Sequence, residues 1–184
     1  ERLPVMIKAK MSMHILHSLF TRGIGGTEKH LAELANGQAA AGHRVSVLLR
    51  GDRKPDGQDD PFPGWLAPEV EQIPIFARWP LPAMAWALHT LKPDIIHTHH
   101  GRDGRYLALA AGNRTPVVAT LHMEYRHKDY KRHDGLICIS DWQMEGVPEA
   151  MREKSAVIPN WIQPAPPVSE EQRQALRARA RVKD

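Results

Sequence analysis

The chain has 184 residues, enough for one domain with a hydrophobic core, and its 42% hydrophobic and 25% charged residues exclude wholesale disorder and a membrane bundle. Lys and Arg number 25 against 21 Asp and Glu, a net charge of +4, and because these cations are dispersed along the chain we expect no nucleic-acid partner. A single cysteine and no apolar run long enough to span a bilayer predict a cytoplasmic protein, soluble or peripheral on the inner face of the membrane.

A strand, a glycine loop and a helix follow one another near the N-terminus. Residues 13–18 predict a buried strand, and residues 27–42 predict a helix with one apolar face that Gly42 ends. Gly25 and Gly26 lie between them, where a helix presents unpaired N–H groups, so we expect this loop to bind a negatively charged group. The alternative is a tight turn without a ligand, with Glu28 as a favourable charge at the helix start.

Strands and helices alternate along the rest of the chain. Strands are predicted at 43–50, 70–76, 93–100, 115–122, 135–140 and 156–160. Helices are predicted at 82–91, 102–113 and 140–151, the last opened by a capping box at Ser140, whereas 51–68 is expected to be a loop and 124–133 a charged segment. This alternation predicts an α/β fold with a Rossmann-like parallel sheet and helices on both faces.

The predicted domain occupies residues 13–162. Residues 1–12 are expected to form a disordered leader. Residues 163–184 comprise a proline-rich linker and a connector helix that begins with a capping pattern at Ser169 but has few apolar side chains to bury.

The histidines of the 93–100 strand are candidate binding residues. His97 and His99 are two positions apart and share one face of the strand. They are either packed structural histidines or polar contacts to a substrate, and His99 is our substrate-binding candidate. Because no Cys or paired carboxylates with ligand spacing lie nearby, no metal-binding residue is predicted.

Further candidates follow other strands. His122 ends a buried strand and is expected to point into the crevice at the carboxyl ends of the strands, although a structural histidine is the alternative. Arg102 and Arg126 are predicted to bind substrate. The segment that contains Arg126 suits an anionic acceptor, and a solvated charged face is the competing interpretation.

An apolar stretch precedes and enters the helix at 82–91. It contains Phe76, Trp79, Met84 and Trp86 beside a basic residue. Such a stretch is typical of a hydrophobic core, and the second interpretation is contact with an anionic membrane surface.

Several motifs occur in the order and spacing of a known family. They are Gly25-Gly-Thr-Glu, Ala41-Gly-His-Arg-Val-Ser-Val, Asp94-Ile-Ile-His-Thr-His, Thr120-Leu-His, Ile139-Ser and Val157-Ile-Pro-Asn. Over residues 13–160 they resemble the N-terminal half of the retaining glycosyltransferases of the GT-B fold, called glycosyltransferase family 4 or group 1.

The resemblance implies the acceptor-side domain of an enzyme that transfers a sugar with retention, without a metal or other cofactor. The donor would be a nucleotide sugar, held mainly by a second domain with a Glu-x7-Glu motif that has no counterpart after Asn160. The acceptor would be a saccharide or lipid-linked hydroxyl, as in cell-envelope glycan or glycolipid synthesis. His122 matches the histidine beside the transferred sugar and is the predicted catalytic residue. Gly25 and Gly26 match the loop near the donor phosphates or the acceptor, and Glu28 of the same motif is a further substrate-binding candidate. This chain alone is expected to be inactive.

Two other classes stay open. The first is a nucleotide-binding Rossmann domain of another enzyme, although Glu28 replaces the third glycine of the Gly-x-Gly-x-x-Gly fingerprint. The second is a non-enzymatic module that binds a membrane or a protein partner.

Overall fold

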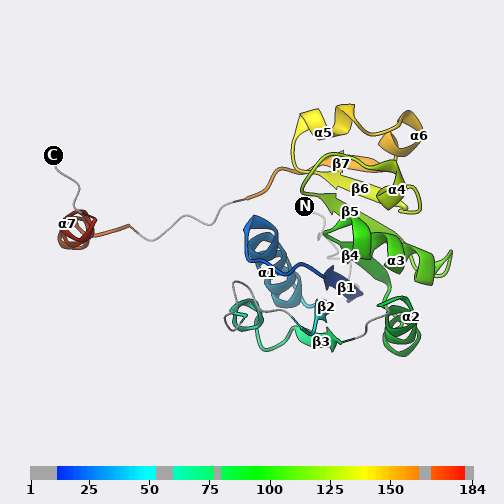
Figure 1. Cartoon of the computed structure of the whole chain (residues 1–184), viewed down its shortest axis with the longest axis horizontal. Helices are drawn as coiled ribbons and strands as arrows, with labels where there is room; N and C mark the ends of the chain where they lie inside the picture. The colour runs from blue at the N-terminus through cyan, green and yellow to red at the C-terminus, as the bar shows by residue number, and fades with distance from the viewer. Residues whose placement is uncertain (1–11, 53–59, 77–79, 162–166, 181–184) are drawn as a thin grey trace, which may run out of the picture.

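The protein folds around one parallel sheet. A computed structural model describes residues 12–52, 60–76, 80–161 and 167–180 (Figure 1). Seven strands pair in the order β3-β2-β1-β4-β5-β6-β7, and every pairing is parallel. The strands are β1 (His14–Leu19), β2 (Arg44–Arg50), β3 (Glu71–Ile75), β4 (Ile95–Thr98), β5 (Val117–Leu121), β6 (Gly135–Cys138) and β7 (Ser155–Val157). The predicted α/β Rossmann-like fold is confirmed.

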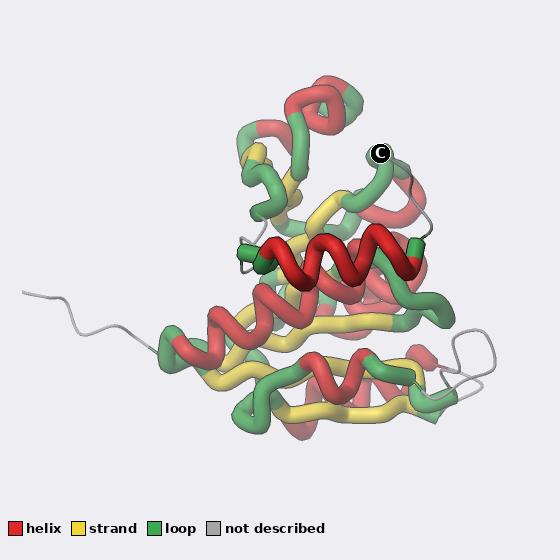
Figure 2. Tube along the Cα trace, turned by 90° about the vertical axis from the view of Figure 1, so that its left-hand side faces the viewer, coloured by secondary structure: helices red, strands yellow, loops and turns green. Residues whose placement is uncertain are grey.

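Helices connect the strands and cover both faces of the sheet (Figure 2). They are α1 (Gly26–Ala40), α2 (Pro80–Leu91), α3 (Gly101–Ala111), α4 (His127–Tyr130), α5 (Asp141–Glu145), α6 (Glu149–Arg152) and α7 (Glu170–Arg179). The chain order reverses between β1 and β4, because α1 leads outward to β2 while α2 returns the chain to the other side of β1. In parallel sheets such a reversal point is where ligands bind.

Strand β1 divides its side chains between two cores. Successive residues of a strand point to opposite faces, so Leu16 packs against α2 and α3 while Leu19 packs against α1. The core beneath α1 includes Leu31 and Ala35 of that helix. All six residues of β1 are buried, which places its two histidines, His14 and His17, inside the protein.

Several predicted boundaries hold. Helix α1 ends just before Gly42, which has the positive φ of +92° that favours glycine, as predicted. The capping box at Ser169 is present at the start of α7. None of the described residues of α7 is buried, in agreement with its few apolar side chains. Residues 1–11 of the expected leader 1–12, and residues 163–166 of the expected linker, lie outside the described residues.

Other predicted elements need correction. The expected loop at 51–68 contains η2, a 3-10 helix over Phe62–Trp65, because the fully buried Phe62 joins the core beneath α1. The charged segment 124–133 contains the short helix α4, and two side chains of the segment are buried, Tyr130 in the helix and His133 after it. The helix predicted at 140–151 is two helices, because Pro148 has no N–H to continue the first.

The capping box predicted at Ser140 is absent. The Ser140 side chain makes no capping hydrogen bond, and the buried Gln143 side chain points elsewhere. Gln143 Oε1 accepts from the Ile139 N–H, and Nε2 donates to the carbonyl oxygens of Leu121 and Met123. Gln143 therefore connects the ends of β5 and β6 instead of capping its own helix.

Candidate functional site

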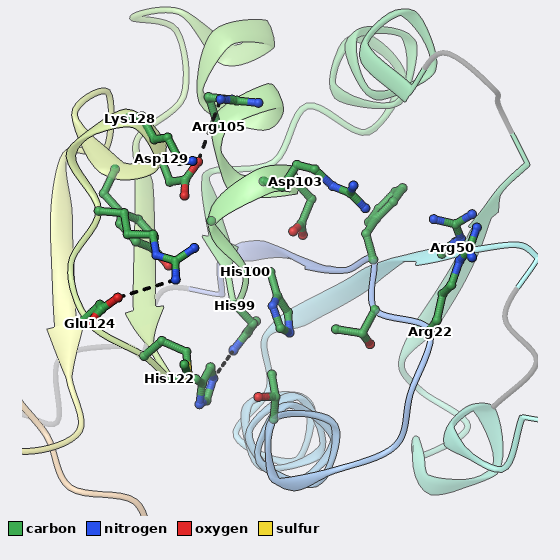
Figure 3. Close-up of a pocket in the computed structure, with 18 residues that line it drawn as sticks. Arg22, Arg50, His99, His100, Asp103, Arg105, His122, Glu124, Lys128 and Asp129 are labelled. Atoms are coloured by element: carbon green, nitrogen blue, oxygen red, sulfur yellow. Dashed lines mark hydrogen bonds and ion pairs between the residues drawn. The ribbon is translucent and has the colours of Figure 1, made fainter. Parts of the chain in front are cut away.

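A cavity of about 980 Å³ opens at the carboxyl ends of β1, β4 and β5. It lies where the chain order of the sheet reverses, the position expected for a ligand site. Figure 3 shows His99 and His122 on one wall, Arg22 and Arg50 on another, and Lys128 with Asp129 across the cavity. The residues after three separate strands therefore face one space.

The cavity has a positive lining. Its cations are Arg22, Arg50, Arg102, Arg105, Arg126 and Lys128, and its acids are Asp103, Glu124 and Asp129. Arg126 is 3.5 Å from Glu124, and Arg105 is 3.9 Å from Asp129, so two of the acids are partly neutralised by neighbours. The remaining positive charge favours an anionic ligand.

The glycine loop borders this cavity without forming its wall. Thr27, in the first turn of α1, lines the cavity, whereas Gly25 and Gly26 are exposed beside it. Gly25 has an extended backbone with φ of −164°, which any residue adopts. A Cβ added at Gly25 would meet only Glu28 Oε2, at 3.6 Å. A Cβ added at Gly26 would meet nothing within 4 Å. Neither backbone conformation nor packing within the described residues therefore requires glycine here.

Glu28 lies under the loop. Its side chain is buried and accepts a hydrogen bond from Thr21 Oγ1, which belongs to the segment after β1. The bond joins the start of α1 to the chain that precedes the glycine loop. This contact gives Glu28 a role in shaping the loop.

Histidines form a connected layer between the sheet and α1. The rings of His97 and His99 are stacked with centroids 4.6 Å apart, which confirms that the two residues share a face. His99 Nε2 is 3.1 Å from His17 Nδ1, and His99 Nδ1 is 3.4 Å from His122 Nε2. His17 Nε2 continues the chain to Gln38 Oε1 at 2.6 Å. His99 is thus a buried link, and His122 is the end of the chain that reaches the cavity.

Burial keeps these imidazoles neutral. Loss of water around the ring, with a smaller contribution from nearby His30, lowers the pKa of His17 and of His122 to about 4. The pKa values of His97 and His99 are also lowered, chiefly by burial. A neutral His122 therefore bonds to His99 through Nε2 and leaves its other ring nitrogen for a hydrogen bond at the cavity near neutral pH.

Asp103, at the start of α3, carries a perturbed carboxyl group. It is buried and accepts a hydrogen bond of 2.7 Å from Ser18 Oγ. Burial raises the pKa of Asp103 to about 7, although the Ser18 bond acts in the opposite direction. Part of the cavity wall therefore carries a proton near neutral pH.

The structure brings together most of the residues proposed from the sequence. His99, Arg102, His122 and Arg126 all line the cavity, and Gly25 with Gly26 lies at its edge. Glu28, also a substrate-binding candidate, is not among the lining residues.

Three further residues of the site, His17, His30 and Asp103, were not predicted from the sequence. His17 had a detectable signal, a polar residue in an otherwise apolar strand, whereas His30 joins the layer only because α1 packs on that face.

The fold and the cavity define a Rossmann-like α/β domain with a ligand site at the switch point of its sheet. The chain belongs to Glycosyltransferase Family 4, whose sequence model matches residues 24–165. Glycosyltransferase membership makes the chain part of a sugar-transferring family, as the motifs implied.

Individual proteins resemble this chain in sequence or in fold. Alpha-monoglucosyldiacylglycerol synthase of Acholeplasma laidlawii is 28% identical over 135 residues, which are 67% of this chain and 32% of the relative. Anabaena HepE, solved with UDP and glucose, superposes with a TM-score of 0.69 at 20% identity, covering 92% of this chain and 50% of HepE. A glycosyltransferase from Rickettsia africae gives a TM-score of 0.72 at 16% identity, covering 94% of this chain and 50% of its own. The chain thus spans about a third to a half of these proteins' lengths. Among the described residues no helix has the length and apolarity to cross a bilayer.

Proposed function

We propose that this domain is the acceptor-side half of a retaining glycosyltransferase that moves a sugar from a nucleotide-sugar donor to an acceptor hydroxyl. The observation that carries the proposal is the positively lined cavity at the switch point, with His122 on its wall. A sugar bearing a phosphate suits this combination, because cations attract the phosphate and a neutral imidazole hydrogen-bonds to hydroxyls. The HepE complexes with UDP and glucose and with UDP-glucose support the same class of donor.

The glycine loop supports a phosphate contact. Since neither φ nor packing requires glycine at Gly25 and Gly26, their missing side chains are best explained by a ligand that approaches the backbone. The start of α1 also presents its first N–H groups on this side. We propose that the donor phosphates approach this loop when a second, donor-binding domain closes over the cavity.

His122 is the proposed catalytic residue. Its ring is held by His99 on one side and faces the cavity on the other. We propose that it contacts the transferred sugar and stabilises charge on it in the transition state. Arg102 and Arg126 would hold the acceptor or the phosphate, as their positions on the cavity wall allow.

A lipid-linked acceptor and a peripheral membrane position are the finer part of the proposal. The similar Acholeplasma protein is a glucosyldiacylglycerol synthase, and two aromatic side chains near α2 are exposed, Phe76 at 74% and Trp86 at 65%. Met84, from the same stretch, is buried in the core, and Trp79 lies outside the described residues. Cosedimentation with anionic and with neutral vesicles tests this part, and W86S should reduce binding to anionic vesicles.

Binding to the chain itself tests the assignment of the cavity. Glucose 1-phosphate is titrated into the isotope-labelled 184-residue chain and followed by NMR, with NAD as the rival ligand. We expect shifts at His122, Arg102 and the glycine loop with glucose 1-phosphate, weakened several-fold by R126Q because one cation is lost. The matched control R173Q changes an arginine on the solvent-exposed helix α7. Saturable NAD binding at the same loop, with no response to glucose 1-phosphate, would favour the dinucleotide-binding class.

Activity tests the division between two domains. The 184-residue chain alone should transfer no sugar from UDP-glucose to diacylglycerol or oligosaccharide acceptors, and robust transfer would contradict the need for a donor domain. In a two-domain enzyme that carries this domain, H122A should lower kcat about 100-fold, with a far-UV spectrum like that of the parent. Unchanged kcat would return His122 to a structural role.

A further inference from the structure

The histidine layer contains a cluster with the composition of a transition-metal site. The ligand nitrogens of His30, His99 and His122 all lie within 4.8 Å of one another. They come from α1, the end of β4 and the end of β5, and meet between the sheet and the helix. We propose that His30, His99 and His122 bind a borderline-soft divalent ion such as Zn²⁺, with the fourth position open to water or a ligand.

The spacing between two of the nitrogens fits tetrahedral zinc. Zn–N bonds of about 2.0–2.1 Å at tetrahedral angles place two ligand nitrogens about 3.3 Å apart. His99 Nδ1 and His122 Nε2 are 3.4 Å apart. To complete the coordination, mainly the side chain of His30 must move toward the other two nitrogens. His30 is only half-buried and lies on the surface of α1.

The hydrogen bonds behind His99 leave its Nδ1, the nitrogen on the side of His122, without a proton. Gln38 Oε1 can only accept, so His17 Nε2 donates to it and His17 Nδ1 is left as an acceptor. His99 Nε2 then donates to His17 Nδ1, and a neutral His99 keeps its lone pair on Nδ1, directed at His122. Zinc-binding histidines generally donate the other ring N–H to such a partner, which fixes the tautomer.

A second cluster, His17, His97 and His99, has the same ligand spacing but a poorer supply of lone pairs. Both nitrogens of His17 are engaged by His99 and Gln38, and His97 Nε2 is 2.8 Å from Thr120 Oγ1. By contrast, His30 Nε2 is buried without a hydrogen-bond partner within the described part of the chain. An unpaired buried nitrogen is costly, and a metal or its bound water would satisfy it.

The cluster of His30, His99 and His122 is also accessible. His99 and His122 line the 980 Å³ cavity, while His30 lines a 420 Å³ groove on the other side, beside Trp161. The Trp161 ring lies 5.1 Å from the His30 ring and shields that side of the site. The sequence predicted no metal because the neighbours of His97 and His99 in the chain offer no further ligands, whereas His30 is brought in by tertiary packing alone.

A bound ion would occupy the nitrogen of His122 that faces His99. Only this consequence rests on the proposed function: an ion on Nε2 would shift the proton of neutral His122 to its cavity-facing nitrogen, turn that acceptor into a donor and so inhibit transfer. Metal binding itself is measured without any activity.

Calorimetry with ZnCl₂ on the untagged 184-residue chain tests the proposal, and the visible absorption of bound Co²⁺ reports tetrahedral coordination. We expect one ion per chain, a raised Tm with Zn²⁺ and no binding of Mg²⁺, which prefers oxygen ligands. H30A removes a ligand and should weaken Zn²⁺ binding about 100-fold, and Q38L, which removes the group that fixes the tautomers, about tenfold. H89A is the matched control, since His89 is exposed on α2, which packs on the face of the sheet opposite α1 and the cluster.

Equal loss in H30A and H89A would overturn the proposal, as would Zn²⁺ binding that H30A leaves unchanged or the absence of saturable binding. If H30A alters folding, its far-UV spectrum and Tm without metal will show it. H30Q, which keeps a polar side chain of similar length, then repeats the test. Retained tight binding in a correctly folded H30Q would also refute the site.

Discussion

The buried carboxyl group of Asp103 makes a quantitative prediction about stability. The side chain is 4% exposed, and its pKa rises from 3.8 in the unfolded chain to about 7 in the fold. The folded state therefore binds the proton more tightly than the unfolded state, so Asp103 reduces stability as pH rises. At 1.36 kcal/mol per pKa unit, the loss above pH 7 reaches about 4 kcal/mol.

The variant D103N isolates this effect. It keeps an oxygen that can accept the hydrogen bond from Ser18 Oγ but cannot ionise. From the two pKa values, the stability of D103N relative to the parent should increase by about 2.5 kcal/mol between pH 5 and pH 8. The buried histidines also make stability depend on pH, because their lowered pKa values make the fold less stable as pH falls through 6.5 toward 4. Their contribution to the free energy of unfolding is the same in both proteins and cancels in the difference.

Urea denaturation of both proteins at a series of pH values is the assay, because the midpoint and slope give the free energy of unfolding. E69Q, which removes one carboxylate from an exposed position, controls for the change in net charge. A difference between D103N and parent that does not vary with pH would refute the reasoning, since it would mean that Asp103 is ionised in the fold at no cost.

Three substitutions test the packing. G135A should destabilise the fold by about 1–3 kcal/mol, because its Cβ would lie 2.7 Å from the backbone oxygen of Lys154. A Cβ at Gly37 in α1 would have nothing within 4 Å, so G37A should be neutral or stabilise the fold by up to about 1 kcal/mol. F62A should cost about 3–5 kcal/mol, because Phe62 is fully buried under α1. Chemical denaturation measures all three, and a harmless F62A would show that residues 60–66 contribute little to the core.

Local patterns in the sequence predicted the strands well. Buried strands in a parallel sheet are short apolar runs between turn residues, and such runs precede the glycine loop, His99 and His122. The same patterns misjudged residues 140–151, because Pro148 interrupts a helical period that composition alone continues. They also missed Phe62 as a core residue, since its neighbours are those of a loop.

The candidate site was predictable only in part. Each parallel strand ends at the same edge of the sheet, so His99, Arg102 and His122 could be placed together from their positions after strands. Arg126 also reaches the cavity, through the turn of α4 that the sequence did not predict. The contact of Glu28 with Thr21 and the buried state of Asp103 depend on side chains from separate segments and had no local signal.

The sequence by itself determined the fold class and the family, because βα alternation and the ordered motifs are local features that survive in any arrangement of loops. Only the tertiary structure decided what the histidines do. Whether an imidazole is buried, which of its nitrogens is bonded and which helix covers it depend on contacts between residues far apart in the chain. His30 belongs to α1 and His99 follows β4, far along the chain, yet packing of α1 on the sheet makes their rings neighbours.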